Sequence, residues 1–179
     1  MSFELLDSET TYKGKVFEVR SDQIRLPDGK ITEMDIVVHN GAVTLIPLEP
    51  LDVLWFVRQY RHATGQELLE LPAGTLESGE PPETCAAREI REEIGMAAGM
   101  LEKMGEFFMA PGYSTEYMYA YLATDLRPDP LKADADEFLR VEKYPLKQIF
   151  KLVESGLIQD SKTLACLYLL HKNRPMLFD

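Results

Sequence analysis

The sequence predicts an α/β domain in which a sheet lies between helices. Short apolar or alternating runs, typical of strands, occupy much of the chain, and segments with helical spacing are scattered among them. The chain has 179 residues, of which 45% are hydrophobic and 27% charged, so one soluble domain can bury a proper core. No internal repeat, low-complexity segment or interdomain linker is visible in the sequence. We therefore expect a single domain over residues 1–179.

The N-terminal region, about residues 1–41, is predicted to form short strands separated by turns. The strand candidates are three segments, at residues 12–20, 23–26 and 31–39. Pro27-Asp28-Gly29 is a strong turn signal, and Asn40-Gly41 is typical of a hairpin. We expect an antiparallel strand region ahead of the main body of the domain.

The main body, about residues 42–179, alternates strand and helix patterns. Two apolar runs, residues 42–48 and 53–59, are predicted to be adjacent buried strands. Further strands are expected at residues 68–72, 101–109, 116–123 and 138–144. Two helices close the chain, residues 146–154 ending at Gly156 and residues 162–171 with Ser161 as the N-cap.

Between the two groups of strands lies the most informative stretch, Gly74 to Met96, with the sequence GTLESGEPPETCAAREIREEIGM. A glycine turn and an acidic loop lead into a helix that is entered through two prolines and stopped by Gly95. At about 100° per residue, three glutamates fall within one third of the helix circumference. They are Glu89, Glu92 and Glu93, and a separate apolar face is predicted for Ala86, Ala87, Ile90 and Ile94.

Carboxylates with this spacing repel one another, because each pair costs about 3 kcal/mol at roughly 6 Å and an effective dielectric constant near 20. Arg88 can offset part of the repulsion through an i, i+4 pair with Glu92. One arginine cannot neutralise three acids, whereas a divalent cation can. Hard oxygen ligands of this kind suit Mg²⁺ or Mn²⁺, and we expect such an ion here.

The charge and composition of the chain indicate which classes of ligand and which cellular compartment to expect. A net charge of −11 disfavours a nucleic acid, but it does not disfavour a small phosphorylated ligand, because a bound metal reverses the local sign. Cys85 and Cys166 lie in helical patterns, so we expect buried free thiols in a reducing compartment. The start of the chain lacks the features of a signal peptide, and no apolar run approaches the ~18 residues of a membrane span. We expect a cytoplasmic protein with no membrane partner.

Nine positions of the central stretch carry a resemblance to a known family. Their pattern is G, five residues, E, seven residues, then R-E-aliphatic-x-E-E-x-G-aliphatic, formed by Gly74, Glu80, Arg88, Glu89, Ile90, Glu92, Glu93, Gly95 and Met96. The chain thereby resembles the Nudix hydrolases, which split a diphosphate linked to some other group. The resemblance implies an α/β/α sandwich with a mixed sheet, here with the added N-terminal antiparallel strand region.

Residues 12–179 also look like the ADP-ribose pyrophosphatase branch of that family. One feature is the basic pair Arg58 and Arg61, shortly before the Glu70 to Gly74 segment, ELPAG. Another is Pro111, fifteen residues past Met96, since a proline at this offset marks ADP-ribose specificity in the family. The third is the N-terminal strand region, which this branch exchanges between two subunits and uses in the adenosine pocket. The resemblance implies a homodimer, with Arg25 as a candidate contact at the partner's active site.

Roles follow from the resemblance, residue by residue. It implies that Glu89 and Glu93 bind two or three Mg²⁺ (or Mn²⁺) ions, with Glu92 as a further ligand or an orienter of water. The backbone carbonyl of Ala73 completes a metal site. The remaining motif positions support the site through an ion pair, a tight turn and a helix stop, at Glu80 with Arg88, Gly74 and Gly95.

The resemblance also assigns the substrate contacts and the base. Arg61 is expected to hold the diphosphate, with Arg58 a second candidate, because a guanidinium presents a rigid fork of donors. Glu70 is expected to line the ribose or phosphate side of the pocket. The base is predicted to be Glu137, in the acidic loop before the last core strand. A shifted register would instead put Ala135 in the slot that a relative fills with glutamate.

Three functions are compared. The first is metal-dependent hydrolysis of ADP-ribose, or a related nucleoside diphosphate sugar, to AMP and ribose 5-phosphate. The second keeps the chemistry and changes the substrate to GDP-mannose or ADP-glucose, which share the diphosphate. The third is a Nudix-like sensor that binds ADP-ribose without cutting it. Intact motif carboxylates and the acidic charge disfavour the sensor.

Overall fold

The computed structural model describes residues 2–50, 52–132 and 138–178. They form two compact units. The N-terminal unit holds the chain up to Gly41 together with Phe107–Tyr117, and the core unit holds Ala42–Glu106 and the chain from Met118 onward. Among these residues no helix has the length and apolar character needed to cross a bilayer.

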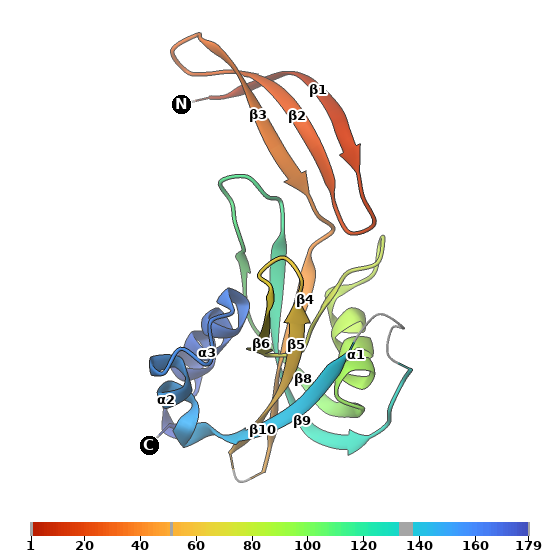
Figure 1. The fold of residues 1–179 in the computed structure, drawn as a ribbon, viewed down its shortest axis with the longest axis vertical. Coiled ribbons are helices and arrows are strands. Elements are labelled where there is room, and N and C mark those ends of the chain that lie inside the picture. Colours follow the sequence, from red (N-terminus) through yellow and green to blue (C-terminus); the bar gives the residue numbers. More distant parts are fainter. Residues whose placement is uncertain (1, 51, 133–137, 179) are drawn as a thin grey trace. The chain divides into compact units, whose positions relative to one another are not determined.

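The N-terminal unit is built on a three-stranded antiparallel sheet (Figure 1). Its strands, in sheet order, are β1 (Glu4–Lys13), β2 (Glu18–Arg25) and β3 (Ile31–Val38). The predicted turn before β3 is present, with Gly29 at a φ of 86°. The predicted strand at residues 12–20 is wrong, because the turn between β1 and β2 interrupts it. Most side chains of β1 are exposed, so no buried face marked this strand in the sequence.

A second segment of the chain joins this unit at β3. The backbone N–H of Val37 donates to the carbonyl of Tyr113 at 2.8 Å, and that of Thr115 donates to the carbonyl of Val37 at 2.9 Å. The hairpin predicted at Asn40-Gly41 is wrong. Gly41 does adopt a positive φ of 87°, but it connects β3 to a strand of a different sheet.

The core unit contains a seven-stranded mixed sheet, which confirms the predicted sheet type. The path of the sheet is β10-β5-β4-β9-β8, with β6 paired to β5 and β7 paired to β4. The strands are β4 (Ala42–Glu49), β5 (Val53–Arg61), β6 (Gln66–Glu70), β7 (Ala73–Thr75), β8 (Met96–Phe108), β9 (Tyr117–Pro128) and β10 (Leu139–Pro145). β4 runs parallel to β9 and antiparallel to β5, so the two apolar runs are neighbours as predicted.

Helices cover the sheet. They are α1 (Pro82–Glu93), α2 (Ile149–Glu154), preceded by the 3-10 turn η1 (Leu146–Gln148), and α3 (Ser161–Asn173), followed by the 3-10 turn η2 (Pro175–Leu177). α1 and α3 both pack on β4, and Figure 1 shows them on its two sides, as an α/β/α sandwich requires. The N-cap of α3 is Asp160, whose carboxylate accepts from the backbone N–H of Thr163 at 2.9 Å, so the predicted cap at Ser161 is wrong by one residue.

The core between α1 and the sheet explains which face of this helix is buried. Ala86, Ile90 and Ile94 are buried as predicted, whereas Ala87 is exposed, because it lies at the outer margin of the apolar face. Cys85 and Cys166 are buried free thiols, which confirms that prediction. Burial raises the pKa of Cys166 to about 12 and also raises that of Cys85, so neither thiol ionises at neutral pH.

Candidate active site

The local sequence of α1 places its acids. The helix begins right after Pro81, and Gly95, with a φ of 71°, takes the chain out of it. Glu89 and Glu93 are only 7% exposed each, although they lie on the acidic face. A surface-facing acidic helix would leave such side chains in water. Here two carboxylates are held against the sheet side of the helix, where a charge needs a partner.

Arg88 is the main partner on this helix. Its Nη1 atom donates to Oε1 of Glu89 at 2.6 Å and to Oε2 of Glu92 at 2.8 Å. Its Nε and Nη2 atoms donate to the two carboxylate oxygens of Glu80, at 3.2 and 3.0 Å. Hydrogen bonding to Arg88 lowers the pKa of Glu80 and, in turn, raises that of Arg88. Arg88 therefore braces the acidic loop against the helix and neutralises more acid than the i, i+4 pair alone.

The segment from Leu71 to Thr75, which ends in β7, lies against the same carboxylates. The backbone N–H of Ala73 donates to Oε2 of Glu93 at 2.9 Å. A Cβ atom built on Gly74 would lie 1.8 Å from the carboxyl carbon of Glu89. Only a residue without a side chain fits at this position. The close approach of this segment to α1 therefore explains why position 74 is a glycine.

The donor set suits a hard divalent cation. Two buried carboxylates, those of Glu89 and Glu93, lie beside the Ala73 segment, and hard cations prefer oxygen ligands. Within residues 2–50, 52–132 and 138–178, no three Asp, Glu, His or Cys side chains converge closely enough to enclose an ion by themselves. A complete shell therefore needs backbone carbonyls, water or substrate oxygens, which is how Mg²⁺ is commonly held.

A second group of charges lies at the end of β6 and the start of α3. Glu70 is 1% exposed, and its Oε1 and Oε2 atoms accept from Nε and Nη2 of Arg61 at 2.9 and 2.8 Å. Lys162 donates to Oε2 of Glu70 and lies 3.0 Å from Oδ1 of Asp160. Burial alone would raise the pKa of Glu70, but the hydrogen bonds from Arg61 and Lys162 outweigh it and lower that pKa.

Sequence reasoning missed Lys162 and Asp160 in this group. Glu70 and Lys162 are 92 residues apart, and no motif links them. One signal was available, because Lys162 precedes Cys166 by four residues and so shares the apolar face of α3. A lysine at such a position needs a buried anion as its partner.

The two candidate arginines of β5 face opposite ways. They are three residues apart in a strand, so their side chains leave from opposite faces of the sheet. Arg58 is 15% exposed and donates to both oxygens of Glu142 on β10, at 2.6 and 3.1 Å. Arg61 is 41% exposed, and its pKa is raised first by hydrogen bonding to Glu70 and to a lesser degree by the charge of Glu93. Of the two arginines, only Arg61 is therefore within electrostatic range of a motif carboxylate.

Three predicted residues belong to the other unit or lie outside the described residues. Arg25 and Pro111 belong to the N-terminal unit, where Arg25 pairs with Glu4 at 2.5 Å and Pro111 is exposed in a turn. Their roles stay predictions. Glu137, the predicted base, and Ala135, its alternative in the other register, lie outside the described residues.

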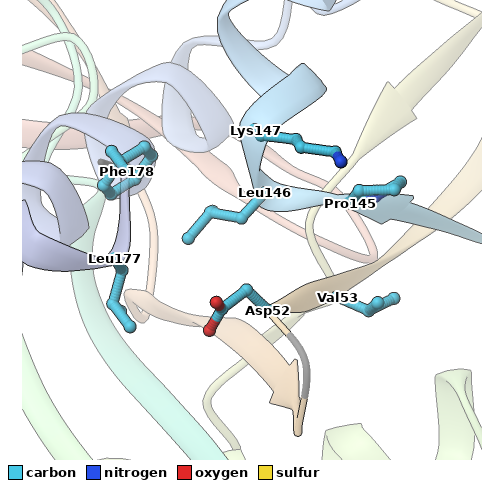
Figure 2. Close-up of a pocket in the computed structure, with 7 residues that line it drawn as sticks. All are labelled: Asp52, Val53, Pro145, Leu146, Lys147, Leu177 and Phe178. Atoms are coloured by element: carbon cyan, nitrogen blue, oxygen red, sulfur yellow. The ribbon is translucent and has the colours of Figure 1, made fainter.

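A depression of about 410 Å³ lies elsewhere in the core unit. Figure 2 shows its lining, formed by Asp52, Val53, Pro145, Leu146, Lys147, Leu177 and Phe178. None of these residues was predicted to take part in the site. The carboxylates and Arg61 therefore define the candidate site by their chemistry, not by the depth of a cavity.

Both the N-terminal region and the main body of the chain match known protein families. The model of the NUDIX domain matches residues 38–165, and that of the nucleoside diphosphate sugar hydrolase N-terminal domain matches residues 3–33. The ADP-ribose pyrophosphatase of Mycobacterium tuberculosis (strain ATCC 25618 / H37Rv) is 38% identical over 94% of this chain and 83% of its own. The GDP-mannose pyrophosphatase of Citrobacter koseri (strain ATCC BAA-895 / CDC 4225-83 / SGSC4696) is 34% identical over 75% of this chain and 74% of its own. A crystal structure of an ADP compounds hydrolase superposes with a TM-score of 0.89 at 26% identity, covering 98% of this chain and 96% of the other.

Proposed function

The chain belongs to the Nudix hydrolase family, and from this premise we propose that it hydrolyses the diphosphate bond of ADP-ribose, or of a closely related nucleoside diphosphate sugar. Hydrolysis of ADP-ribose releases AMP and ribose 5-phosphate. The observation that carries the proposal is the pair of buried carboxylates of α1, Glu89 and Glu93, together with the exposed guanidinium of Arg61 that Glu70 orients, since a diphosphate needs both a metal site and a cationic clamp. Relatives named for ADP-ribose and ADP compounds favour adenosine as the nucleoside.

The metal site is proposed on α1 and its loop. Nudix hydrolases generally use divalent metal ions, and we assign Glu89, Glu93 and the Ala73 carbonyl as ligands, with Glu92 as a further ligand or an orienter of water. Mg²⁺ or Mn²⁺, two or three ions per site, suits these oxygen donors. When bound, such ions neutralise charge on the diphosphate and lower the pKa of water. Hydrogen bonding to the Ala73 amide keeps the Glu93 carboxylate oriented.

The substrate's diphosphate is assigned to Arg61. Its Nε and Nη2 atoms are held by Glu70, and this fixes the guanidinium plane while the side chain stays 41% exposed. Arg58 is a weaker candidate, because its fork is already engaged by Glu142 on β10. Glu137 remains our candidate for the base that removes a proton from the attacking water.

A panel of substrates tests the function. Purified protein with MgCl₂ is given ADP-ribose, ADP-glucose and GDP-mannose at equal concentrations, and released AMP or GMP is followed by chromatography. We expect kcat/KM to be highest for ADP-ribose. Equal or better turnover of GDP-mannose would favour the second candidate, which the related GDP-mannose pyrophosphatase supports. Tight binding of ADP-ribose without any turnover would favour the sensor.

The assembly and location are also proposed. We infer a cytoplasmic homodimer in which the N-terminal strands are exchanged, with Arg25 reaching the partner's active site. Support comes from the matched N-terminal family over residues 3–33 and from the large apolar side chains that this region exposes. In the dimer, an Arg25→Ala variant is expected to show a raised KM, and an unchanged KM would count against that contact.

A further inference from the structure

The structure contains a buried charge group next to Arg61 and separate from the proposed metal ligands. It consists of Glu70, Lys162 and Asp160, which connect the start of α3 to Arg61. Resting on the function proposed above, we infer that Lys162 is a positioning residue for Arg61, acting through Glu70. Lys162 neutralises the charge of Glu70, so that the guanidinium of Arg61 keeps its orientation and can still bind an anion.

Geometry sets the orientation. Glu70 binds Arg61 with both oxygens, at 2.9 and 2.8 Å, so the plane of the guanidinium follows the plane of the carboxylate. Lys162 donates to Oε2, one of these two oxygens. In the described part of the chain Nη1 of Arg61 has no hydrogen-bond acceptor, and Arg61 is the exposed member of the pair. The remaining donor edge of the fork is therefore the part that can meet a phosphate.

Charge explains why the lysine is needed. Arg61 and Lys162 carry two positive charges, and Glu70 and Asp160 carry two negative charges, so the group is neutral. Glu70 is 1% exposed and the Lys162 side chain 11%, so water cannot replace a lost ammonium. Without Lys162 the group would carry one excess negative charge beside Arg61, and a diphosphate anion would be attracted less.

The position of Lys162 is itself fixed by the start of α3. Asp160 accepts from the N–H and the hydroxyl of Thr163, at 2.9 and 2.6 Å, and pairs with Lys162 through its other oxygen. The Thr163 hydroxyl also accepts from the N–H of Leu71 at 2.8 Å. The start of α3 thus fixes the position of Lys162 and also that of Leu71, the residue after Glu70.

A double-mutant cycle tests the inference. KM and kcat for ADP-ribose are measured with saturating MgCl₂ for Lys162→Met, Arg61→Ala and the double variant. We expect Lys162→Met to raise KM by about tenfold with kcat little changed, because the lost interaction is one of binding. In the Arg61→Ala background the same change should leave KM within about twofold, because coupled residues are not additive.

Controls separate positioning from folding. Lys162→Arg keeps the positive charge, so its KM should lie close to that of the wild type. Lys172→Met removes an exposed lysine of the same helix and should leave both KM and kcat unchanged. If Lys162→Met does not fold, Lys162→Gln removes the charge and keeps a donor. An equal rise in KM with and without Arg61, or a lowered melting temperature with KM unchanged, would overturn the inference.

Binding of inorganic pyrophosphate keeps the two proposals apart. Calorimetry measures its affinity in the same four proteins without any turnover. A wild type that fails to cleave ADP-ribose would refute the proposed function alone. The positioning role would still be supported if Lys162→Met weakened pyrophosphate binding only when Arg61 is present, and it would be refuted if binding were unaffected.

Discussion

Glu93 and Glu89 reach the same acidic face but are held differently. Glu93 accepts from the backbone N–H of Ala73, whereas Glu89 shares Nη1 of Arg88 with Glu92. A backbone amide orients the Glu93 carboxylate toward the Ala73 segment, whose carbonyl is proposed as a metal ligand. Because Glu93 is buried and is itself proposed as a metal ligand, we expect removal of its charge to have a large effect.

Glu93→Gln keeps the size of the side chain and removes its charge. We expect kcat for ADP-ribose to fall by roughly 10³-fold or more, with the circular dichroism spectrum unchanged. Glu83→Gln, on the exposed first turn of the same helix, is the matched control and should retain full activity. A fully active Glu93→Gln enzyme would contradict the proposed role of Glu93 as a metal ligand.

Gly74→Ala tests the contact between loop and helix. The new Cβ would lie 1.8 Å from the carboxyl carbon of Glu89, so either the loop or that carboxylate must move. We expect kcat/KM to fall by about 10²-fold or more, since a displacement of about 1 Å at a reacting centre has such an effect. Thr75→Ala, at the exposed next position, should be nearly silent. Equal activities of the two variants would contradict the steric role of Gly74.

At the scale of elements, both β5 and α3 contribute side chains to the candidate site. The alternation of β5 sends Arg61 to Glu70 and Arg58 to Glu142, so one strand serves both the site and the edge of the sheet. α3 contributes through its first turn, which carries Asp160, Lys162 and Thr163. An element that looks purely structural in the sequence thereby supports the diphosphate site.

The N-cap of α3 gives a direct test at this scale. Asp160→Ala should lower the free energy of unfolding by at least about 1–2 kcal/mol, because its carboxylate caps Thr163 and also pairs with Lys162. Ser161→Ala should cost only about a few tenths of a kcal/mol, since this side chain is exposed and is not the cap. Urea denaturation of both variants provides the comparison. A larger loss for Ser161→Ala would contradict the assigned cap.

At the scale of the whole molecule, the chain has a net charge of −11 and buries a small number of its acids. Glu70 is the most buried of them, and its neighbours Arg61 and Lys162 hold the carboxylate in its charged form. The apolar surface is distributed differently, because several large side chains of the N-terminal unit are more than half exposed. They are Phe3, Leu5, Tyr12, Val16, Ile31, Phe108 and Tyr113.

Acid should destabilise the protein partly through Glu70. Its pKa in the folded state lies below its ordinary value of 4.5, so the stabilisation is present above that pH. It is lost as the pH falls through the lowered pKa, because the unfolded chain then binds the proton more readily. Chemical denaturation between pH 7 and 3 should show a steeper loss of stability for the wild type than for Glu70→Gln. Parallel curves would refute the contribution of Glu70.

The exposed apolar side chains of the N-terminal unit test the proposed dimer. Leu5→Asp introduces a charge on β1 at an exposed position, so the single subunit should tolerate it. If the strands are exchanged between subunits, this change should weaken the dimer by about tenfold or more. Thr10→Asp, a polar exposed position on the same strand, is the control. Light scattering after size-exclusion chromatography measures the mass, and a wild type that is monomeric at all concentrations would reject the dimer.

The sequence by itself determined the fold class, most core strands, the acidic helix and its glycines. These features depend on local periodicity, turn chemistry and motif spacing, all of which act over a few residues. It did not determine β1, whose exposed side chains lack a buried face, nor the N-cap of α3, because Asp160 and Ser161 are both good caps.

Only the tertiary structure decided how the charges are paired. Arg88 contacts three carboxylates, Arg58 is turned to β10, and Lys162 meets Glu70 across 92 residues of chain. Burial makes each pairing necessary, since a charge away from water must find an opposite charge wherever the fold brings one. Spacing along the chain names the candidates, but the packing of β5, β6 and α3 pairs Arg61 with Glu70, while Arg58, from the same strand, pairs with Glu142 on β10.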